Sequence, residues 1–372
     1  MVRDGTGLSG GSADATIRDH SSSGHQAAAI DYQPIDPPKS IRRWSAGALI
    51  VTILIGTGCW AVVAAACLLV GSTGKLGWVE IQYRLENVLL ASLVGAALGS
   101  AGAVYQAILR NPLADPYLLG VSSGASLLAF VWRLPFAAVL STSLLVAAGQ
   151  QAFSFGGALI SVGIALLMAT RRGRLEPITL LLVGVIINAI NGAIFLLLYA
   201  LFPQLAAGSG SALNFLIGGI QTNLTHGQEW LSASLIGAGW IVMMYLTGQL
   251  NAASLSEAEA QAMGVQIHRV RWIALIVASI VTAAAVAISG PIGFIGLICP
   301  HLVRLVVGSD QRRLIPAATA FGAALLACAD AITRLLSRQD LINTVLPVGV
   351  LTALLGGPFF LYLLWRSRRP TA

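Results

Sequence analysis

Hydrophobic positions along the chain gather into ten long runs separated by short polar segments. A membrane-spanning helix needs about 20 mostly apolar residues, and most of the runs reach that length. They cover residues 44–70, 88–109, 118–136, 138–169, 177–201, 229–248, 270–289, 291–307, 314–336 and 344–365. The pattern predicts an all-α polytopic membrane protein with ten transmembrane helices.

The third and eighth runs are short and interrupted by glycine or proline. Non-helical backbone inside a membrane is tolerated only where protein surrounds it or where it lines a water-filled cavity. Interrupted spans are therefore candidates for a substrate path. The candidate residues on these two runs are Gly120, Ser123, Gly124, Pro291, Gly293 and Gly296.

Composition supports a membrane protein and excludes several other classes. The chain has 372 residues, of which 56% are hydrophobic and 10% are charged, whereas a soluble protein carries about 25% charged residues. The mean hydropathy is +0.80. These values exclude a soluble enzyme and a disordered protein. The net charge of +7 comes from dispersed residues, so we expect a lipid bilayer and no nucleic acid as partner.

The basic residues predict the orientation, because cytoplasmic loops are enriched in Lys and Arg. With the N-terminus inside, 17 of the 22 basic residues are cytoplasmic. The five on the outer side are Lys75, Arg84, Arg133, Arg334 and Arg338. This bias requires an even number of spans and places both termini in the cytoplasm.

The two ends of the chain differ from the apolar part. Residues 1–43 are rich in Ser, Gly, Asp and His, and so little apolar surface predicts a disordered cytoplasmic tail. Residues 44–366 form the ten-helix domain, and residues 367–372 form a short cytoplasmic tail.

Motifs for catalysis or for an internal energy source are absent from the sequence. It contains no G-x-x-x-x-G-K-[ST] phosphate loop, no HExxH and no paired-cysteine motif, so we expect no enzyme activity, metal or cofactor. Asp330 is the only acidic residue deep in a span, and Arg334 lies one turn away on the same face. A secondary transporter with its own ion-coupled site normally has more such groups, and it remains the alternative.

Three glycines and one glutamine share a face of the second span: Gly95, Gly99, Gly102 and Gln106. Small residues at this spacing favour close helix packing. Gln106 could form a packing hydrogen bond or belong to the substrate path. The same alternatives hold for two amides in the fifth span, Asn188 and Asn191.

The predicted cytoplasmic loop at 249–269 contains two overlapping capping boxes, which are typical of a short helix. They pair Ser254 with Glu257 and Ser256 with Glu259, and the helix would end at Met263 and Gly264. A short cytoplasmic helix of this kind either docks onto a partner's groove or serves as a connector.

Three long motifs resemble the FecCD-type permeases, the transmembrane subunits of type II ABC importers for iron siderophores, haem and cobalamin. They are RNPLADPYLLGVSSGA at 110–125, GPIGFIGLICPHLVR at 290–304 and LPVGVLTALLGGPFFLYLLWR at 346–366. The resemblance covers residues 44–366 and implies ten helices with both termini in the cytoplasm.

The resemblance also implies partners and a cargo. We expect a homodimer, or a pair with a homologous permease, in a bacterial cell membrane. Two cytoplasmic ABC ATPase subunits would supply the energy, and an extracytoplasmic substrate-binding protein would deliver the ligand. The expected ligand is a ferric siderophore, with haem and then cobalamin as the next candidates.

Matching positions assign further roles by resemblance. The segment 254–264 looks like the family's ATPase-coupling helix, and residues 212–220 look like its outer gate. Arg84 and Arg334 match arginines that meet acidic residues on the binding protein. The sequence departs from the family where Glu86 and Asn87 replace Pro-Arg, and where Val345 replaces a common Glu.

Overall fold

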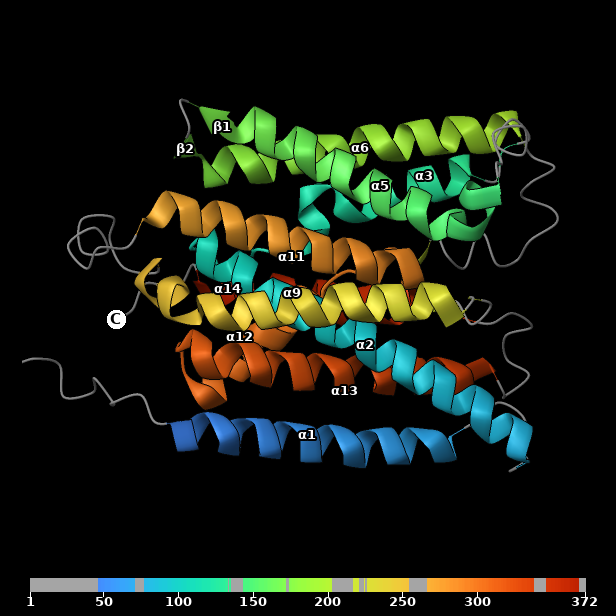
Figure 1. Ribbon diagram of the computed structural model, residues 1–372, viewed down its shortest axis with the longest axis horizontal. Coiled ribbons are helices and arrows are strands. Elements are labelled where there is room, and N and C mark those ends of the chain that lie inside the picture. The colour runs from blue at the N-terminus through green and yellow to red at the C-terminus, as the bar shows by residue number, and fades with distance from the viewer. Residues whose placement is uncertain are drawn as a thin grey trace, which may run out of the picture. The chain divides into compact units, whose positions relative to one another are not determined.

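The computed structural model describes residues 46–70, 77–132, 134, 143–171, 174–202, 217–220, 224, 226–253, 266–337 and 346–367. Ten α-helices lie within these residues (Figure 1). They are α1 (Ala46–Leu69), α2 (Trp78–Ile108), α3 (Val121–Val131), α5 (Ser143–Ala169), α6 (Pro177–Leu201), α9 (His226–Ala253), α11 (Ile267–Ser289), α12 (Ile295–Val307), α13 (Gln311–Ser337) and α14 (Val348–Ser367). The 3₁₀ helix η1 (Pro116–Leu119) precedes α3, and the two-residue strands β1 (Thr170–Arg171) and β2 (Arg174–Leu175) pair antiparallel.

The ten helices coincide with the ten predicted spans, so the all-α polytopic fold is confirmed. By length and composition alone, seven of the described helices could cross a membrane. Three others, at Val121–Val131, Ile295–Val307 and Val348–Leu363, are apolar but shorter. Two of these three are the spans that the sequence predicted to be interrupted.

Several predicted boundaries were wrong. The second span was expected to begin at residue 88, but α2 begins at Trp78, so Arg84, Glu86 and Asn87 lie on the helix and not in an outer loop. Polar side chains can extend this helix because its outer turns still pack against protein, with Arg84 and Asn87 both buried. The fourth span contains a break at Gly149, whose φ is 59° and ψ −164°.

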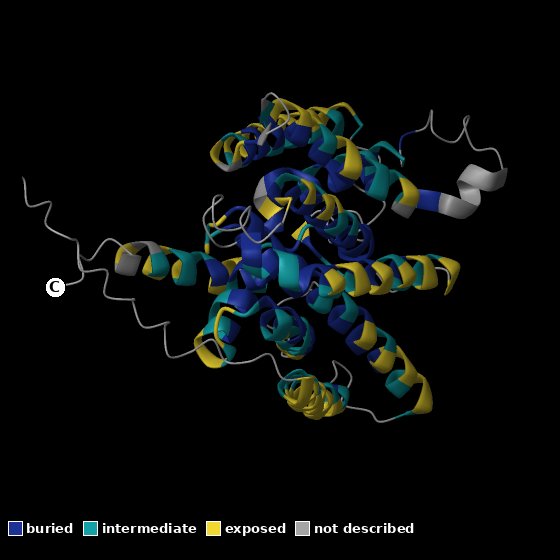
Figure 2. Ribbon diagram, turned by 60° about the vertical axis from the view of Figure 1, so that its left-hand side comes forward, coloured by how far each residue is buried: buried dark blue, intermediate teal, exposed yellow. Residues whose placement is uncertain are grey.

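Helix α2 is buried along most of its length. Figure 2 shows the buried residues gathered in the middle of the bundle and the exposed ones toward its periphery. The glycine face of α2 packs against two neighbours, as predicted. A Cβ on Gly95 would strike the carbonyl of Gly322 in α13, and one on Gly102 would strike the carbonyl of Gly296 in α12. Glycine at these positions therefore lets the backbones of three helices touch, which is how helices associate without a hydrophobic driving force in lipid.

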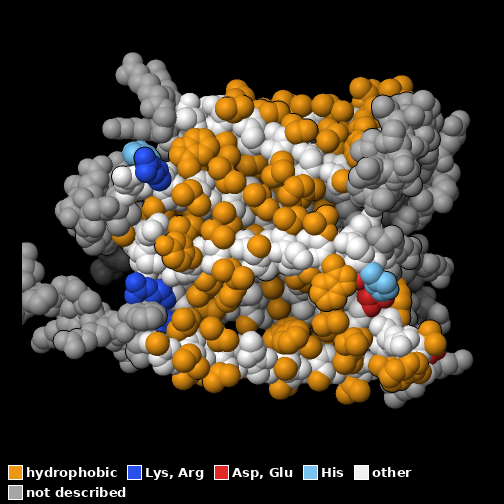
Figure 3. Space-filling view, viewed as in Figure 1, with side chains coloured by type: hydrophobic (Ala, Val, Ile, Leu, Met, Phe, Trp, Pro, Cys, Tyr) orange, Lys and Arg blue, Asp and Glu red, His pale blue; other side chains and the backbone are white. Residues whose placement is uncertain are grey.

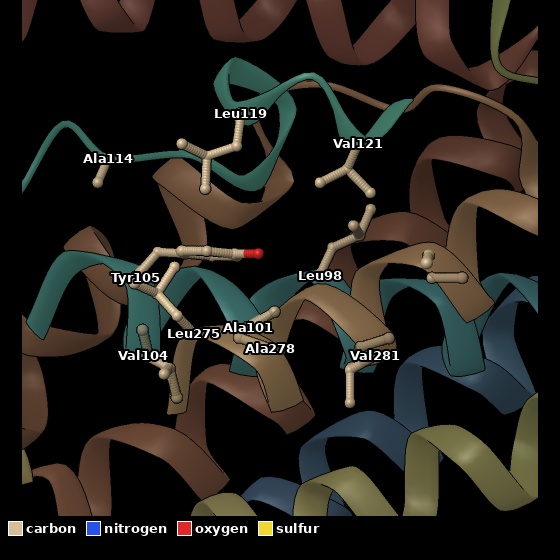
Figure 4. Close-up of a cluster of buried hydrophobic side chains, with 14 of the residues drawn as sticks. Leu98, Ala101, Val104, Tyr105, Ala114, Leu119, Val121, Leu275, Ala278 and Val281 are labelled. Atoms are coloured by element: carbon tan, nitrogen blue, oxygen red, sulfur yellow. The ribbon is translucent and has the colours of Figure 1, made fainter. Parts of the chain in front are cut away.

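The core beside α2 is formed by α11 and by the segment that links α2 to α3. Figure 4 shows Leu98, Ala101 and Val104 of α2 beside Leu275 and Ala278 of α11. The hydroxyl of Tyr105 in the same cluster makes a hydrogen bond of 2.8 Å with Ser279 Oγ. A buried tyrosine hydroxyl needs such a partner, so the Tyr105 hydroxyl is satisfied within an otherwise apolar cluster.

The outer surface of the bundle is apolar in its middle. Figure 3 shows hydrophobic side chains across this zone, with Lys and Arg side chains at the end where α11 and α13 begin. Helices α1 and α6 expose large apolar side chains such as Leu54 at 64% and Ile178 at 84%. In water such a surface would be an aggregation hazard, whereas in a bilayer it is the expected face toward lipid.

Candidate functional site

Two non-helical segments meet beside the middle of α2, one preceding η1 and the other linking α11 to α12. The Asp115 carboxylate joins them, because it accepts hydrogen bonds of 3.0 Å from the backbone N–H groups of Tyr117 and of Phe294. A Cβ on Gly296 would lie 2.7 Å from Pro116 and 3.2 Å from the carbonyl of Leu98. These segments are therefore held by protein contacts at the depth where α2 is most buried.

Helix α6 reaches these segments through its two asparagines. Asn188 Nδ2 donates to the carbonyl of Tyr117 at 3.1 Å. Asn191 Nδ2 donates to Ser123 Oγ at 3.0 Å and to Ser161 Oγ at 3.1 Å. The two amides thus connect α6 to η1, α3 and α5, which also contact one another. Helices α3, α5 and α6 lie next to one another in Figure 1. The hydrogen bonds of the packing alternative are thus present, and a place for these amides on the substrate path stays a prediction.

Gln106 forms packing hydrogen bonds rather than facing open space. Its Nε2 donates to the carbonyl of Leu297 at 3.2 Å, and its Oε1 accepts from Arg304 Nη2 at 3.0 Å. The side chain is 3% exposed. Gln106 and Arg304 therefore fasten α2 to α12 at the end of the glycine face.

The nine predicted path residues divide into two groups. Gln106, Gly120, Gly124 and Gly296 are buried in helix contacts, and Gly120 adopts a φ of 83° where the chain turns into α3. The other five remain partly accessible: Ser123, Asn188, Asn191, Pro291 and Gly293.

Tyr117 joins the accessible group, although the sequence did not single it out. It is 42% exposed, and its ring would lie 3.7 Å from a Cβ on Gly293. The available signal was an aromatic residue directly after the Asp-Pro pair that starts η1.

A pocket of about 160 Å³ lies between α2, α13 and the start of α14. We call it the outer pocket, because the sequence predicts that this end of the bundle faces outward. Arg334 Nη2 lies 2.8 Å from Asp330 Oδ2 in this pocket, which confirms the predicted pair. Asn87 and Gly219 also line the pocket. The second predicted docking arginine, Arg84, is 4% exposed, and its Nη1 donates to the carbonyl of Leu68 at 3.3 Å.

The predicted gate at 212–220 is described only at residues 217–220. Gly218 has a φ of 89°, and its carbonyl accepts a hydrogen bond of 2.8 Å from the N–H of Gly349 in α14. A Cβ on Gly218 would strike the carbonyl of Pro291. This short segment therefore touches both α14 and one of the predicted path segments. Val345 lies outside the described residues.

At the opposite end of the bundle, contacts among four residues hold the last turn of α9 in place. We call these residues the α9 clamp (Arg110, Asn251, Ala253 and Asp310). Arg110 donates from Nε and Nη2 to the carbonyl of Ala253, at 3.1 and 3.0 Å. Asn251 Nδ2 donates to Asp310 Oδ1 at 2.6 Å, and Asn251 Oδ1 accepts from the N–H of Gln311 at 2.8 Å.

Arg110 adopts a φ of 48°, an uncommon conformation for a residue with a side chain. The clamp therefore ties α9 both to the segment after α2 and to the start of α13. Ala253 directly precedes the predicted coupling segment, and its residues Ser254, Ser256, Glu257, Glu259, Met263 and Gly264 lie outside the described residues.

Within the part of the chain that the structure describes, no group of three or more His, Cys, Asp or Glu residues could hold a metal ion. Polar contacts that the structure does describe inside the bundle include the amide bridges of α6 and the Asp330–Arg334 pair.

Comparison with known proteins defines the class. The family model of the FecCD transport family matches residues 45–366. The cobalamin import permease BtuC of Halobacterium salinarum is 39% identical over 76% of this chain and 72% of its own length. The hemin transport permease HmuU of Yersinia pestis is 37% identical over 80% of this chain and 86% of its own length.

A solved structure has the same fold. An inward-facing metal-chelate type ABC transporter superposes with a TM-score of 0.70 at 26% identity, and the match covers 85% of this chain and 99% of that chain. The protein is thus a multi-pass membrane permease. It belongs to the FecCD transport family.

Proposed function

We propose that the chain is the transmembrane subunit of an ATP-driven importer that moves a metal chelate across the cell membrane. A ferric siderophore is the first candidate cargo, and haem and cobalamin are the next. Support comes from the relatives, whose names specify hemin and cobalamin, and from the metal-chelate transporter of the same fold. ATP hydrolysis belongs to two separate cytoplasmic ABC subunits.

The α9 clamp is the observation that carries this proposal. A segment that receives force from an ATPase must be attached firmly to the spans that it moves. Arg110 and Asp310 attach the end of α9 at two points, directly before the proposed coupling residues 254–264. Hydrogen bonds to charged groups contribute about 1.5–3 kcal/mol each, so these contacts would keep α9 attached to the segment after α2 and to the start of α13 during a movement.

The substrate path would lie along the partly accessible face of α6. Ser123, Asn188, Asn191, Pro291 and Gly293 contribute to it directly. Gln106, Gly120, Gly124 and Gly296 contribute by fixing the backbones behind it. The small side chains and neutral amides on this face fit a bulky cargo rather than a dehydrated ion.

A dimer would place this path at its centre. Helices α6 and α14 expose apolar side chains such as Ile190 at 52% and Leu354 at 67%. A second copy, or a homologous permease, would cover these faces and close the path against lipid.

The outer pocket would receive the substrate-binding protein. Arg334 and Arg84 lie at this end of α13 and α2, and arginine pairs with a partner's carboxylate in a fork that fixes docking register. Arg334 is already paired with Asp330. On docking, a carboxylate of the binding protein would therefore replace Asp330 as the partner of Arg334 or share Arg334 with it. In this arrangement both termini are cytoplasmic.

The test of the proposal is transport by the reconstituted complex. The chain, its ATPase subunits and its binding protein in proteoliposomes should take up a radioiron-labelled siderophore, labelled haem or labelled cobalamin only with ATP on the ATPase side. Uptake that requires an ion gradient and does not depend on ATP would indicate the alternative, a secondary transporter centred on Asp330 and Arg334.

A further inference from the structure

A groove of about 370 Å³ lies between α1 and α9, on the face away from α6. Figure 3 shows it as a hollow between these two helices. Residues of α2 and α13 form its floor, and Trp60 and Trp240 stand in its walls. No contact described above for the substrate path, the outer pocket or the α9 clamp uses this groove.

The lining of the groove presents almost only carbon to an occupant. Both indole N–H groups are satisfied, since Trp60 Nε1 donates to Ser92 Oγ and Trp240 Nε1 donates to Thr319 Oγ1, each at 2.9 Å. Three hydroxyls line the groove. Those of Ser92 and Thr319 are the partners of the two tryptophans, and that of Thr57 donates to the carbonyl of Ile53 at 2.8 Å. A polar ligand would find few groups to bind, whereas an apolar chain would bury its surface.

The surroundings of the groove are those of the bilayer. Ile241 and Tyr245 on α9 are 66% and 82% exposed, and Leu54 on α1 is 64% exposed. A cavity of about 150 Å³ can hold a benzene molecule, so this groove has room for a run of methylenes. A whole helix, about 10–12 Å across with its side chains, is a poor match for this volume.

Positive charge lies at one end of the groove. Pro316, Thr319, Ala320 and Ala323 line it from α13 with helical spacing. Arg312 and Arg313 lie four and three residues before Pro316, so they continue the same face about 6 Å further along the axis. The nearby Asp310 carboxylate is engaged by Asn251 and by the N–H of Arg312.

We propose that the α1–α9 groove binds one acyl chain of an anionic phospholipid, whose phosphate lies at Arg312 and Arg313. The lipid comes from the leaflet at the start of α13. Lys and Arg side chains near a membrane surface attract anionic headgroups, and the apolar groove then selects the chain beneath the headgroup. The bound lipid fills the gap that α1 leaves against α9 and fixes α1 on the bundle.

Tryptophan quenching tests this site in the full chain. The protein is reconstituted in phosphatidylcholine vesicles that contain increasing fractions of dibrominated phosphatidylglycerol or dibrominated phosphatidylcholine. The signal from the groove is the difference between the native chain and a variant carrying Trp60→Phe and Trp240→Phe. Trp230→Phe is the matched control, because Trp230 is 73% exposed on α9 and outside the groove.

We expect the groove tryptophans to reach half-maximal quenching at a roughly tenfold lower fraction of the anionic lipid than of the zwitterionic one. Trp230 should show no such preference. Combined Arg312→Gln and Arg313→Gln substitutions should abolish the preference. Ala96→Leu, which places a larger side chain on the groove floor, should weaken quenching by both lipids, whereas Ala96→Ser should not.

Three results would overturn the proposal. The first is equal quenching by the two lipids in the native chain. The second is a preference for the anionic lipid that persists after the two Arg→Gln changes. These changes lie at a helix end, so this test does not depend on whether the Ala96→Leu variant folds. The third is efficient disulfide cross-linking of Trp240→Cys between two chains, which would show that a second copy occupies the groove.

Discussion

The guanidinium of Arg110 donates two hydrogen bonds to the carbonyl of Ala253, although the two residues are 143 positions apart. Ala253 is the last residue of α9 and Arg110 follows the end of α2. Arg110 reaches this position with a φ of 48°. Such a conformation costs of order 1–3 kcal/mol and persists only where the surroundings hold it, and the two hydrogen bonds to Ala253 are among the contacts that do so.

Replacing Arg110 should uncouple transport from ATP hydrolysis. Arg110→Gln removes the charged fork, and a loss near 1.5 kcal/mol, at the low end for hydrogen bonds to charged groups, would favour the detached state of α9 about tenfold. We therefore expect less substrate moved per ATP hydrolysed. Arg110→Lys keeps the charge without the fork and should give an intermediate value. The measurement is uptake and ATP hydrolysis on the same proteoliposomes.

Asn251→Ala provides a matched test, because it removes the second point of the α9 clamp and leaves Arg110 intact. It should also lower the amount of substrate moved per ATP hydrolysed. Unchanged ratios in both Arg110→Gln and Asn251→Ala, with the complex still assembled, would show that the end of α9 plays no part in coupling.

The glycine face of α2 should tolerate no Cβ at its closest contact. Gly102→Ala would drive a methyl group into the carbonyl of Gly296, and overpacking of this kind costs about 1–3 kcal/mol. We expect a lower thermal unfolding temperature in detergent. Gly163→Ala is the control, since its Cβ meets nothing within 4 Å, and it should be neutral or stabilising by up to about 1 kcal/mol. Equal effects at the two positions would contradict close packing of α2 on α12.

Breaking the ion pair in the outer pocket should destabilise the protein more than removing both charges. Asp330→Asn leaves the Arg334 charge largely buried without its carboxylate, a change that costs about 3–5 kcal/mol in buried pairs. Combined Asp330→Asn and Arg334→Gln changes should recover part of that loss. Thermal unfolding of the two single variants and the double variant measures the coupling, and strictly additive effects would show that the pair contributes no stability.

Docking of the binding protein can be separated from this stability effect. Arg334→Gln should weaken binding-protein affinity about tenfold at low salt and less at moderate salt, because added salt screens the attraction between the arginine and the partner's carboxylates as the two proteins approach. Arg84→Gln should behave in the same way. An affinity that neither change alters at either salt concentration would rule out electrostatic docking by these arginines.

Sequence reasoning reached the ten helices because long apolar runs, unlike short strands, leave little ambiguity about their state. It also paired Asp330 with Arg334, since residues four apart on a helix are neighbours. It placed the start of α2 ten residues too late, because Glu86 and Asn87 look like loop residues until the burial of that turn is known.

The α9 clamp could not be predicted from the sequence. Its contacts join Arg110 to Ala253 and Asn251 to Asp310, which are 143 and 59 positions apart, and no local pattern encodes such distances. For the same reason the sequence left Gln106 open between packing and path. Its partners, Leu297 and Arg304, lie on another helix.

The central claim is that this permease moves its cargo with energy from partner ATPases. The most direct measurement is uptake of a radioiron-labelled siderophore, labelled haem or labelled cobalamin by proteoliposomes that hold the full complex, with ATP on the ATPase side and ionophores present. The account predicts that uptake requires ATP and persists when ion gradients are collapsed. Uptake that continues without ATP and stops with the ionophores would contradict it.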